Sequence, residues 1–325
     1  MKKILFFIII FTYSYSFEPY LEVDTDYRLQ NYHESYPYYK VIGGVKHSGD
    51  FYYLELSGIA EYDYDPVVDL YRGYVDLYYK DYSISIGRQS INWGSGYAFN
   101  LANTFYVQEL LDPKAERRGV DSVYLKYSSP NMSRLEFAYF KSDINTGVKS
   151  DNFGSRYTFV VDNFEFMANY FYIKQHLPNS MLIESNNKLV LEAKGDIGIG
   201  IWGQLGYDHF QSVDYVSGVI GADYNFDISE HSLYTVIESE YNEYVTALFL
   251  SYDFSINEDL SFKQGYTLIN HDWFITNVVT YTYNDYLEFQ FIYNFFHYDE
   301  NIKFYTHNRD EALNNEITFR ISIYL

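Results

Sequence analysis

The sequence predicts an all-β fold: a transmembrane antiparallel β-barrel of about 18 strands, with a long loop folded into its lumen. The last ten residues, 316–325, alternate strictly between polar and apolar side chains, as a strand between water and hydrocarbon must. The same alternation recurs along the chain in segments of roughly ten residues, the length that a tilted strand needs to cross a bilayer. The chain also contains 40 tyrosines and 26 phenylalanines, which suits the aromatic girdles at the two membrane interfaces.

The N-terminus has the pattern of a secretory signal peptide. Lys2 and Lys3 precede an apolar run over residues 4–11, and the small residues Ser14 and Ser16 stand just before Phe17. The apolar run is too short to span a membrane as a helix. We therefore expect residues 1–16 to be removed on export, and residues 17–325 to form one outer-membrane β-barrel domain.

The predicted strands follow one another along the whole of the exported chain. Each is a stretch of period-two alternation bounded by turn-forming residues. If both termini lie on the short-turn side, the strand count is even, with 16 as the alternative to 18. The strands begin near Tyr20, Tyr38, Phe51, Leu70, Tyr82, Gly119, Met132, Gly154, Phe164, Asn187, Ile197, Val213, Ser232, Tyr244, Asp259, Trp273, Tyr286 and Glu316.

The links between these strands alternate in length. After every even strand the link is short and rich in turn-forming residues, as at residues 80–81 and 284–285. After the odd strands several links are longer and more polar, although those near Asp208, Glu240 and His271 are not clearly long. Short turns on one side and long loops on the other are typical of an outer-membrane barrel, whose short turns face the periplasm.

Alternation also assigns the two faces of each strand. In the strand from Phe51, Leu54 and Leu56 fall on the lipid face and Glu55 on the lumen face, while Ile59 is an apolar exception on the lumen face. The strand from Tyr286 separates apolar from polar residues in the same way. The lumen is therefore expected to be polar and hydrated, and the sheet must close because lipid cannot pair a free strand edge.

The most specific local string is Gly87-Arg88-Gln89-Ser90-Ile91-Asn92-Trp93-Gly94, followed by a long segment that ends at Glu116-Arg117-Arg118-Gly119. It resembles porin-like outer-membrane barrel families, in which a G-R-Q-x-x-x-W-G string leaves a strand and enters a long loop. The resemblance implies a channel-like barrel and no reaction. By alternation Arg88 shares a face with Ile84 and Ile86, so either a bulge follows Ile86 or the arginine lies above the membrane.

The segment from Ser90 to Arg118 is too long for a hairpin turn. It can fold back into the lumen and narrow the wide aqueous interior of a large barrel. Gly94 and Gly96 permit tight turns, and Trp93 can pack against the wall. A surface loop that merely caps the barrel is the alternative.

Charged residues at lumen positions supply the candidate pore lining. Rows of opposite charge would orient polar solutes, whereas ion pairs that only brace the lumen are an equally simple interpretation. Arg28 and Arg320 are expected to be near neighbours, because the first and last strands pair. The candidates for the pore lining or the constriction are Arg28, Arg72, Arg88, Trp93, Arg117, Arg118, Arg134, Arg320, Glu55 and Asp76.

The formal charge of −21 argues against nucleic acid as a partner and favours cation preference, unless arginines gather at the narrowest point. There is no cysteine, so strand pairing and packing must supply the stability. We expect contacts with outer-membrane lipid and lipopolysaccharide, and insertion by the barrel-assembly machinery. A homotrimer is one assembly open to such a barrel. No cofactor or metal site is predicted.

The predicted function is passive diffusion of small hydrophilic solutes through a non-enzymatic channel in the bacterial outer membrane. The main alternative is a plugged barrel that binds or assembles surface polysaccharide or acts as an adhesin, with loop aromatics such as Tyr62, Tyr64, Phe105 and Tyr106 stacking on sugars. An outer-membrane phospholipase comes third. The string His33-Glu34-Ser35 resembles part of its pattern, but the serine-rich continuation is absent, and no serine, imidazole and orienting group are brought together.

Overall fold

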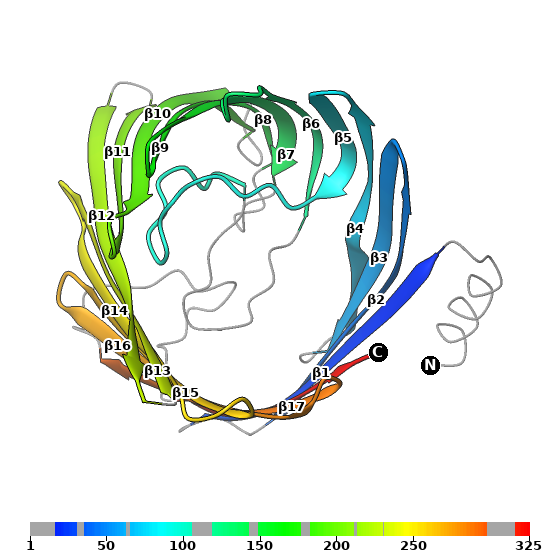
Figure 1. Ribbon diagram of the computed structural model, residues 1–325, viewed down its shortest axis with the longest axis vertical. Helices are drawn as coiled ribbons and strands as arrows, with labels where there is room; N and C mark the ends of the chain where they lie inside the picture. Colours follow the sequence, from blue (N-terminus) through cyan, green and yellow to red (C-terminus); the bar gives the residue numbers. More distant parts are fainter. Residues whose placement is uncertain are drawn as a thin grey trace.

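The computed structural model describes residues 17–30, 36–62, 66–105, 119–142, 149–176, 183–210, 213–229, 231–297 and 316–325. These residues form a closed, antiparallel β-barrel of 18 strands (Figure 1). No helix within the described ranges is long and apolar enough to cross a membrane. The predicted signal peptide, residues 1–16, lies outside them.

The strands follow the order of the sequence around the barrel, and each is hydrogen-bonded to its two neighbours. The predicted fold and strand count are confirmed, and β5, β9, β12 and β18 begin at the residues named from the sequence. The bounds are β1 (Glu18–Gln30), β2 (Tyr36–Gly49), β3 (Tyr52–Tyr62), β4 (Pro66–Tyr79), β5 (Tyr82–Gln89), β6 (Val120–Ser128), β7 (Arg134–Ser142), β8 (Lys149–Val161), β9 (Phe164–His176), β10 (Ile183–Asp196), β11 (Gly200–Phe210), β12 (Val213–Ile228), β13 (His231–Asn242), β14 (Thr246–Ser255), β15 (Leu260–Ile269), β16 (Asp272–Asn284), β17 (Leu287–His297) and β18 (Glu316–Tyr324).

The barrel closes where β1 meets β18. The two strands pair antiparallel from Glu22 opposite Tyr324 to Gln30 opposite Glu316. Beyond the last ladder pair, Leu21 and Leu325 exchange two backbone hydrogen bonds of 2.8 Å. Every strand edge is thereby paired, which is the condition for a sheet to reside in hydrocarbon.

The predicted alternation of short and long links holds only in part. The turns after even strands are short, and Lys80 and Asp162 take positive φ angles of 53° and 52° in two of them. After the odd strands, the links at 211–212, 243–245 and 270–271 are also short, as the sequence indicated, whereas β5 and β6 are joined by the long segment 90–119. We call the two rims the short-turn end and the long-loop end.

The alternation of faces is visible in β3 and β4. Leu56 is 46% exposed on the outer face, while the adjacent Ser57 is 2% exposed on the lumen face. Ile59 is buried on the lumen face, as expected for the one exception. A register shift between Ser57 and Gly58 leaves Tyr71 of β4 as the extra residue of a bulge.

The described part of the long segment, residues 90–105, lies inside the barrel (Figure 1, cyan). Its apolar side chains join inner-face residues of strands from β6 to β14 in one buried cluster. We call residues 90–105 the inserted loop. The barrel therefore has a packed core along one wall, and this core fixes the position of the loop.

Candidate functional site in the barrel lumen

The tip of the inserted loop is held by a buried carboxylate. Glu238, on the inner face of β13, accepts hydrogen bonds from the backbone N–H groups of Tyr97 and Ala98 at 2.8 and 2.9 Å. The N–H of Phe99 and the indole N–H of Trp202 donate to the same carboxylate. Glu238 is fully buried. A buried charge is tolerated only with such donors, so Glu238 and the loop depend on each other.

A second anchor lies on the strands two and three positions from β13. Glu192 of β10 and Gln204 of β11 are opposite each other in the sheet, and the Gln204 amide donates to Glu192 at 3.0 Å. Ser95 donates to Glu192 from its backbone N–H and its hydroxyl at 2.7 and 2.9 Å. The N–H of Leu101 donates to the Gln204 carbonyl at 2.7 Å. The loop is thus tied to the wall on both sides of its tip.

An aromatic cluster completes the attachment. Trp93 is 1% exposed, and its ring centroid lies 5.1 Å from that of Phe105 and 5.5 Å from that of Phe171. Gly154 of β8 makes room for it, because a Cβ there would lie 2.8 Å from the indole ring. Trp93 therefore packs against the wall, in the way that the sequence indicated.

The loop also requires one glycine for its own turn. Gly94 has a φ of 107°, a conformation that L side chains rarely adopt. The side-chain amide of Asn100 donates to the Trp93 carbonyl at 3.0 Å and occupies the place where a Cβ of Gly94 would stand. The turn after Trp93 is fixed by this contact.

Two predicted lumen acids lie near the short-turn end and are held by neutral donors. Glu55 accepts hydrogen bonds from the hydroxyls of Tyr20, Tyr53 and Tyr74 at 2.9, 3.1 and 3.2 Å. Asp76 accepts one from Tyr78 at 3.1 Å. These tyrosines position the carboxylates without neutralising their charge.

The predicted lumen arginine of the last strand is paired with an acid. Arg320 donates from Nε and a terminal nitrogen to both oxygens of Asp26, each at 2.8 Å, and the two side chains are 4% and 0% exposed. On the next strand, Lys40 lies 2.8 Å from Asp24. Arg28 stands opposite Thr318, two residues from the Asp26–Arg320 pair, so its backbone is near Arg320 as expected.

Two further predicted arginines also have local partners. Arg134, at the start of β7, forms an ion pair with Glu165, which lies 3.2 Å from Lys194 as well. Arg72 of β4 places its guanidinium 4.3 Å from the ring centroid of Tyr71, the bulge residue. The described lumen therefore contains dispersed pairs and no arginine row.

Arg88 is a correction to the candidate set. No bulge separates it from Ile86, since β5 pairs in continuous register with both neighbours, and it lies on the outer face at the long-loop end. There it bonds Asp121 at 2.8 Å and Asp69 at 3.3 Å. Its pairing partners thus place it on the outer rim and away from the pore lining. Arg117, Arg118 and the string His33-Glu34-Ser35 lie outside the described residues.

A hollow of about 590 Å³ lies beneath the loop tip, on the lumen side. It is lined by Ser95 and Tyr97 of the inserted loop and by the short turns around residues 162–163 and 196. Glu165, Lys194 and Asp223 contribute charged groups. Both signs of charge and an aromatic ring therefore face one water-accessible space, as a site for hydrophilic solutes requires.

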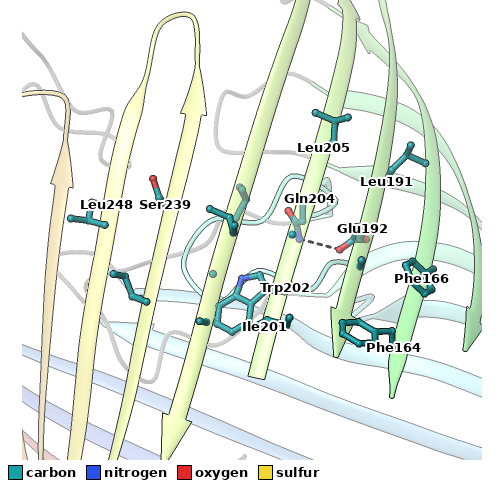
Figure 2. A pocket seen from close by; sticks show the side chains of 17 residues that line it. Phe164, Phe166, Leu191, Glu192, Ile201, Trp202, Gln204, Leu205, Ser239 and Leu248 are labelled. Atoms are coloured by element: carbon teal, nitrogen blue, oxygen red, sulfur yellow. Dashed lines mark hydrogen bonds between the residues drawn. The ribbon is translucent and has the colours of Figure 1, made fainter. Parts of the chain in front are cut away.

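A second hollow, of about 850 Å³, lies on the outer face behind the anchors (Figure 2). Its apolar lining residues include Leu191, Gly203, Leu205, Ile220 and Ala222. Figure 2 shows the Glu192–Gln204 hydrogen bond on the strands that form it. The strands that carry the loop anchors on their inner face thus offer an apolar surface to the membrane.

The sequence reasoning missed the anchors Glu192, Gln204 and Glu238. Their alternation places them on the lumen face, but nothing in their spacing connects Glu238 to loop residues about 140 positions earlier. One usable signal was the presence of Gly154 and Gly206 at lumen positions. Small inward residues mark where a bulky segment packs, and these two face Trp93 and Leu101.

Comparison with known proteins places the chain by its fold. No protein-family model and no curated protein matches the sequence. Among solved structures, OccK5 of Pseudomonas aeruginosa is 11% identical with a TM-score of 0.64. The match covers 95% of this chain and 98% of the OccK5 chain. Wzi, an outer membrane protein involved in group 1 capsule assembly in Escherichia coli and a carbohydrate-binding β-barrel, is 11% identical with a TM-score of 0.64, covering 93% and 84%.

A third similar structure is Pseudomonas aeruginosa OccK2, determined in complex with glucuronate. It is 12% identical with a TM-score of 0.60, and the match covers 95% of this chain and 96% of that one. A loop L8 deletion mutant of OmpT, an outer membrane protein of Vibrio cholerae, is 10% identical with a TM-score of 0.51, and the match covers 95% of this chain and 99% of that one. The fold of this chain is thus that of the β-barrel proteins of the bacterial outer membrane.

Proposed function

We propose that this barrel is a channel for passive diffusion of small hydrophilic solutes, narrowed by the inserted loop. The observation that carries the proposal is the anchoring of the loop. Its amides are bound by Glu192, Gln204 and Glu238, and its aromatic residues by the wall, so residues 90–105 lie along one side of the lumen. A loop held in this way narrows a polar passage at a fixed place.

The lumen charges favour cations in this proposal. The described arginines Arg134 and Arg320 are each paired with an acid, whereas Glu55 and Asp76 are held by uncharged tyrosine hydroxyls. Carboxylates near a pore mouth raise the local concentration of cations. No catalytic step is part of the proposed function.

Swelling of liposomes that contain the refolded barrel tests this function. Uncharged sugars of increasing size are supplied outside, and the rate of swelling reports their entry. The proposal predicts entry of small sugars and a sharp decline with size, because the loop sets the diameter. Folded protein that admits none of the sugars contradicts it.

A barrel that binds surface polysaccharide is the second candidate, because the fold resembles Wzi as closely as it resembles OccK5. Of the aromatic residues suggested for sugar stacking, Phe105 is buried against the wall and Tyr62 is 46% exposed. Tyr64 and Tyr106 lie outside the described residues. This candidate predicts retention of a polymer without flux of small sugars in the same liposomes.

A further inference from the structure

Two amide side chains face outward from the middle of adjacent strands. Gln264 is the fifth residue of β15 and Asn277 the sixth of β16, and the two stand opposite each other in the ladder. On the outer face they are flanked by Phe262 and Tyr266 along β15. The lumen side of the same strand is marked by Lys263, which bonds the loop residue Tyr97 at 3.1 Å. The amides therefore lie where the barrel meets hydrocarbon.

The amides are only partly satisfied within the described chain. Tyr252 donates to the Gln264 carbonyl at 2.7 Å, and the Gln264 amide donates to the Asn277 carbonyl at 2.5 Å. Asn277 donates to the backbone carbonyl of Tyr293 at 3.4 Å, near the limit of a hydrogen bond. Each amide nitrogen carries two hydrogens, so these contacts leave donors over on both residues.

An unpaired donor in hydrocarbon is costly, and an acyl chain has no acceptor to offer. We infer that this outer face of β14–β17, centred on Gln264 and Asn277, is an interface with a second copy of the same chain. An amide both donates and accepts, so two identical faces complement each other's spare groups. Polar side chains hold membrane segments together in this way.

The surroundings of the pair have the composition of an interface core. The rings of Trp273 and Phe295 stack with centroids 5.3 Å apart, and Tyr266 lies 6.3 Å from Trp273. Tyr252 and Phe262 flank the other side, 5.9 Å apart. Aromatic residues around a few hydrogen-bonding groups are the usual make-up of the buried centre of a protein interface.

The outer hollow near β10–β14 does not need a polar partner. The hydroxyl of Ser239, a polar side chain in its lining, donates to the carbonyl of Ala247 at 3.0 Å. The outward side chains that line the hollow are otherwise apolar, so a lipid chain is a sufficient occupant. Of these two regions of the described outer face, the amide pair is the one with hydrogen-bond donors left over, which is why the interface is placed there.

The test compares the subunit number of purified, folded barrels in lipid nanodiscs, measured by native mass spectrometry. The double variant Gln264→Met, Asn277→Leu removes the polar groups at nearly constant volume. We expect roughly tenfold weaker association, since about two membrane hydrogen bonds are lost. Thr235→Val is the matched control, because this outward hydroxyl already donates to the Tyr224 carbonyl at 3.2 Å and should leave association unchanged.

Crosslinking locates the contact independently. The chain has no cysteine, so Ile275→Cys beside the pair and Leu56→Cys on the exposed outer face of β3 each provide a unique thiol. A short bis-maleimide should join two copies in native membranes through Cys at 275 and not through Cys at 56. Monomeric wild-type barrels, an unchanged assembly in the double variant, or a crosslink to a different protein would each overturn the proposal.

Discussion

Glu238 is the residue on which the position of the inserted loop most depends. It is fully buried and accepts three consecutive backbone N–H groups of the loop, together with the indole of Trp202. Loss of the carboxylate would leave these donors without an acceptor in a packed environment. One side chain therefore joins the wall of the barrel to the loop that, in the proposed function, narrows the passage.

Substitution Glu238→Ala should release the loop tip. We expect a loss of about 3 kcal/mol in the free energy of unfolding, because buried donors lose charged partners. The size limit for sugars in the swelling assay should rise. Glu238→Gln keeps an acceptor oxygen and should change the stability and the size limit less. Ser239→Ala, on the opposite face of the same strand, should leave the size limit unchanged. An unchanged limit in Glu238→Ala would show that this loop does not set the diameter.

Gly154 offers a second test at the scale of one residue. A Cβ at this position would lie 2.8 Å from the Trp93 ring, so Gly154→Ala should displace the indole and cost roughly 1–3 kcal/mol by overpacking. A shift in tryptophan emission should accompany the loss. Gly203→Ala is the control, since the heavy atom nearest to its Cβ would lie 3.7 Å away. Equal behaviour of both variants would contradict the packing described here.

At the scale of the elements, the β1–β18 seam closes the barrel. The buried pair of Asp26 and Arg320 joins the first strand to the last through two hydrogen bonds of 2.8 Å. We expect either Asp26→Ala or Arg320→Ala to lower the free energy of unfolding by about 3–5 kcal/mol, because each leaves a buried charge without its main partner.

The double variant at the seam should lose less than the sum of the two single variants, since it removes both charges together. Denaturant titration followed by circular dichroism measures all four proteins. Strict additivity would mean that the ion pair does not couple the two strands.

The strands themselves could be predicted from the sequence because each follows a local rule. Period-two alternation and turn residues identified the first residues of β5, β9, β12 and β18. Other boundaries shifted: β8 begins at Lys149 instead of near Gly154, because polar residues beyond the membrane continue the ladder. Alternation left two positions open for Arg88, beyond a bulge or above the membrane, and in the structure it lies on the outer rim.

The site could be predicted only in part, because its contacts are not local. Trp93 and the loop were identified from composition and length, whereas the anchors depend on contacts across as many as 141 residues. The role of a charged side chain also depends on the residue with which it pairs. Arg320 was a candidate for the pore lining, with a bracing ion pair as the alternative, and its buried bond to Asp26 favours the bracing ion pair.

At the scale of the whole molecule, the net charge of −21 and the acids held by tyrosine hydroxyls at the short-turn end predict cation preference. The double variant Glu55→Gln, Asp76→Asn should move the reversal potential in a salt gradient toward zero. Thr25→Val, on the outer face of β1, should leave it unchanged. A wild-type channel that prefers anions would contradict this assignment of the lumen charge.

The central claim is that the anchored loop narrows a passage that remains open. Single-channel current through the refolded wild-type barrel in a planar bilayer tests it most directly. We predict a steady open conductance, with a reversal potential of the sign that cation preference requires. Silence from protein shown to be folded and inserted would contradict the claim and would point to a closed barrel that binds its ligand from outside.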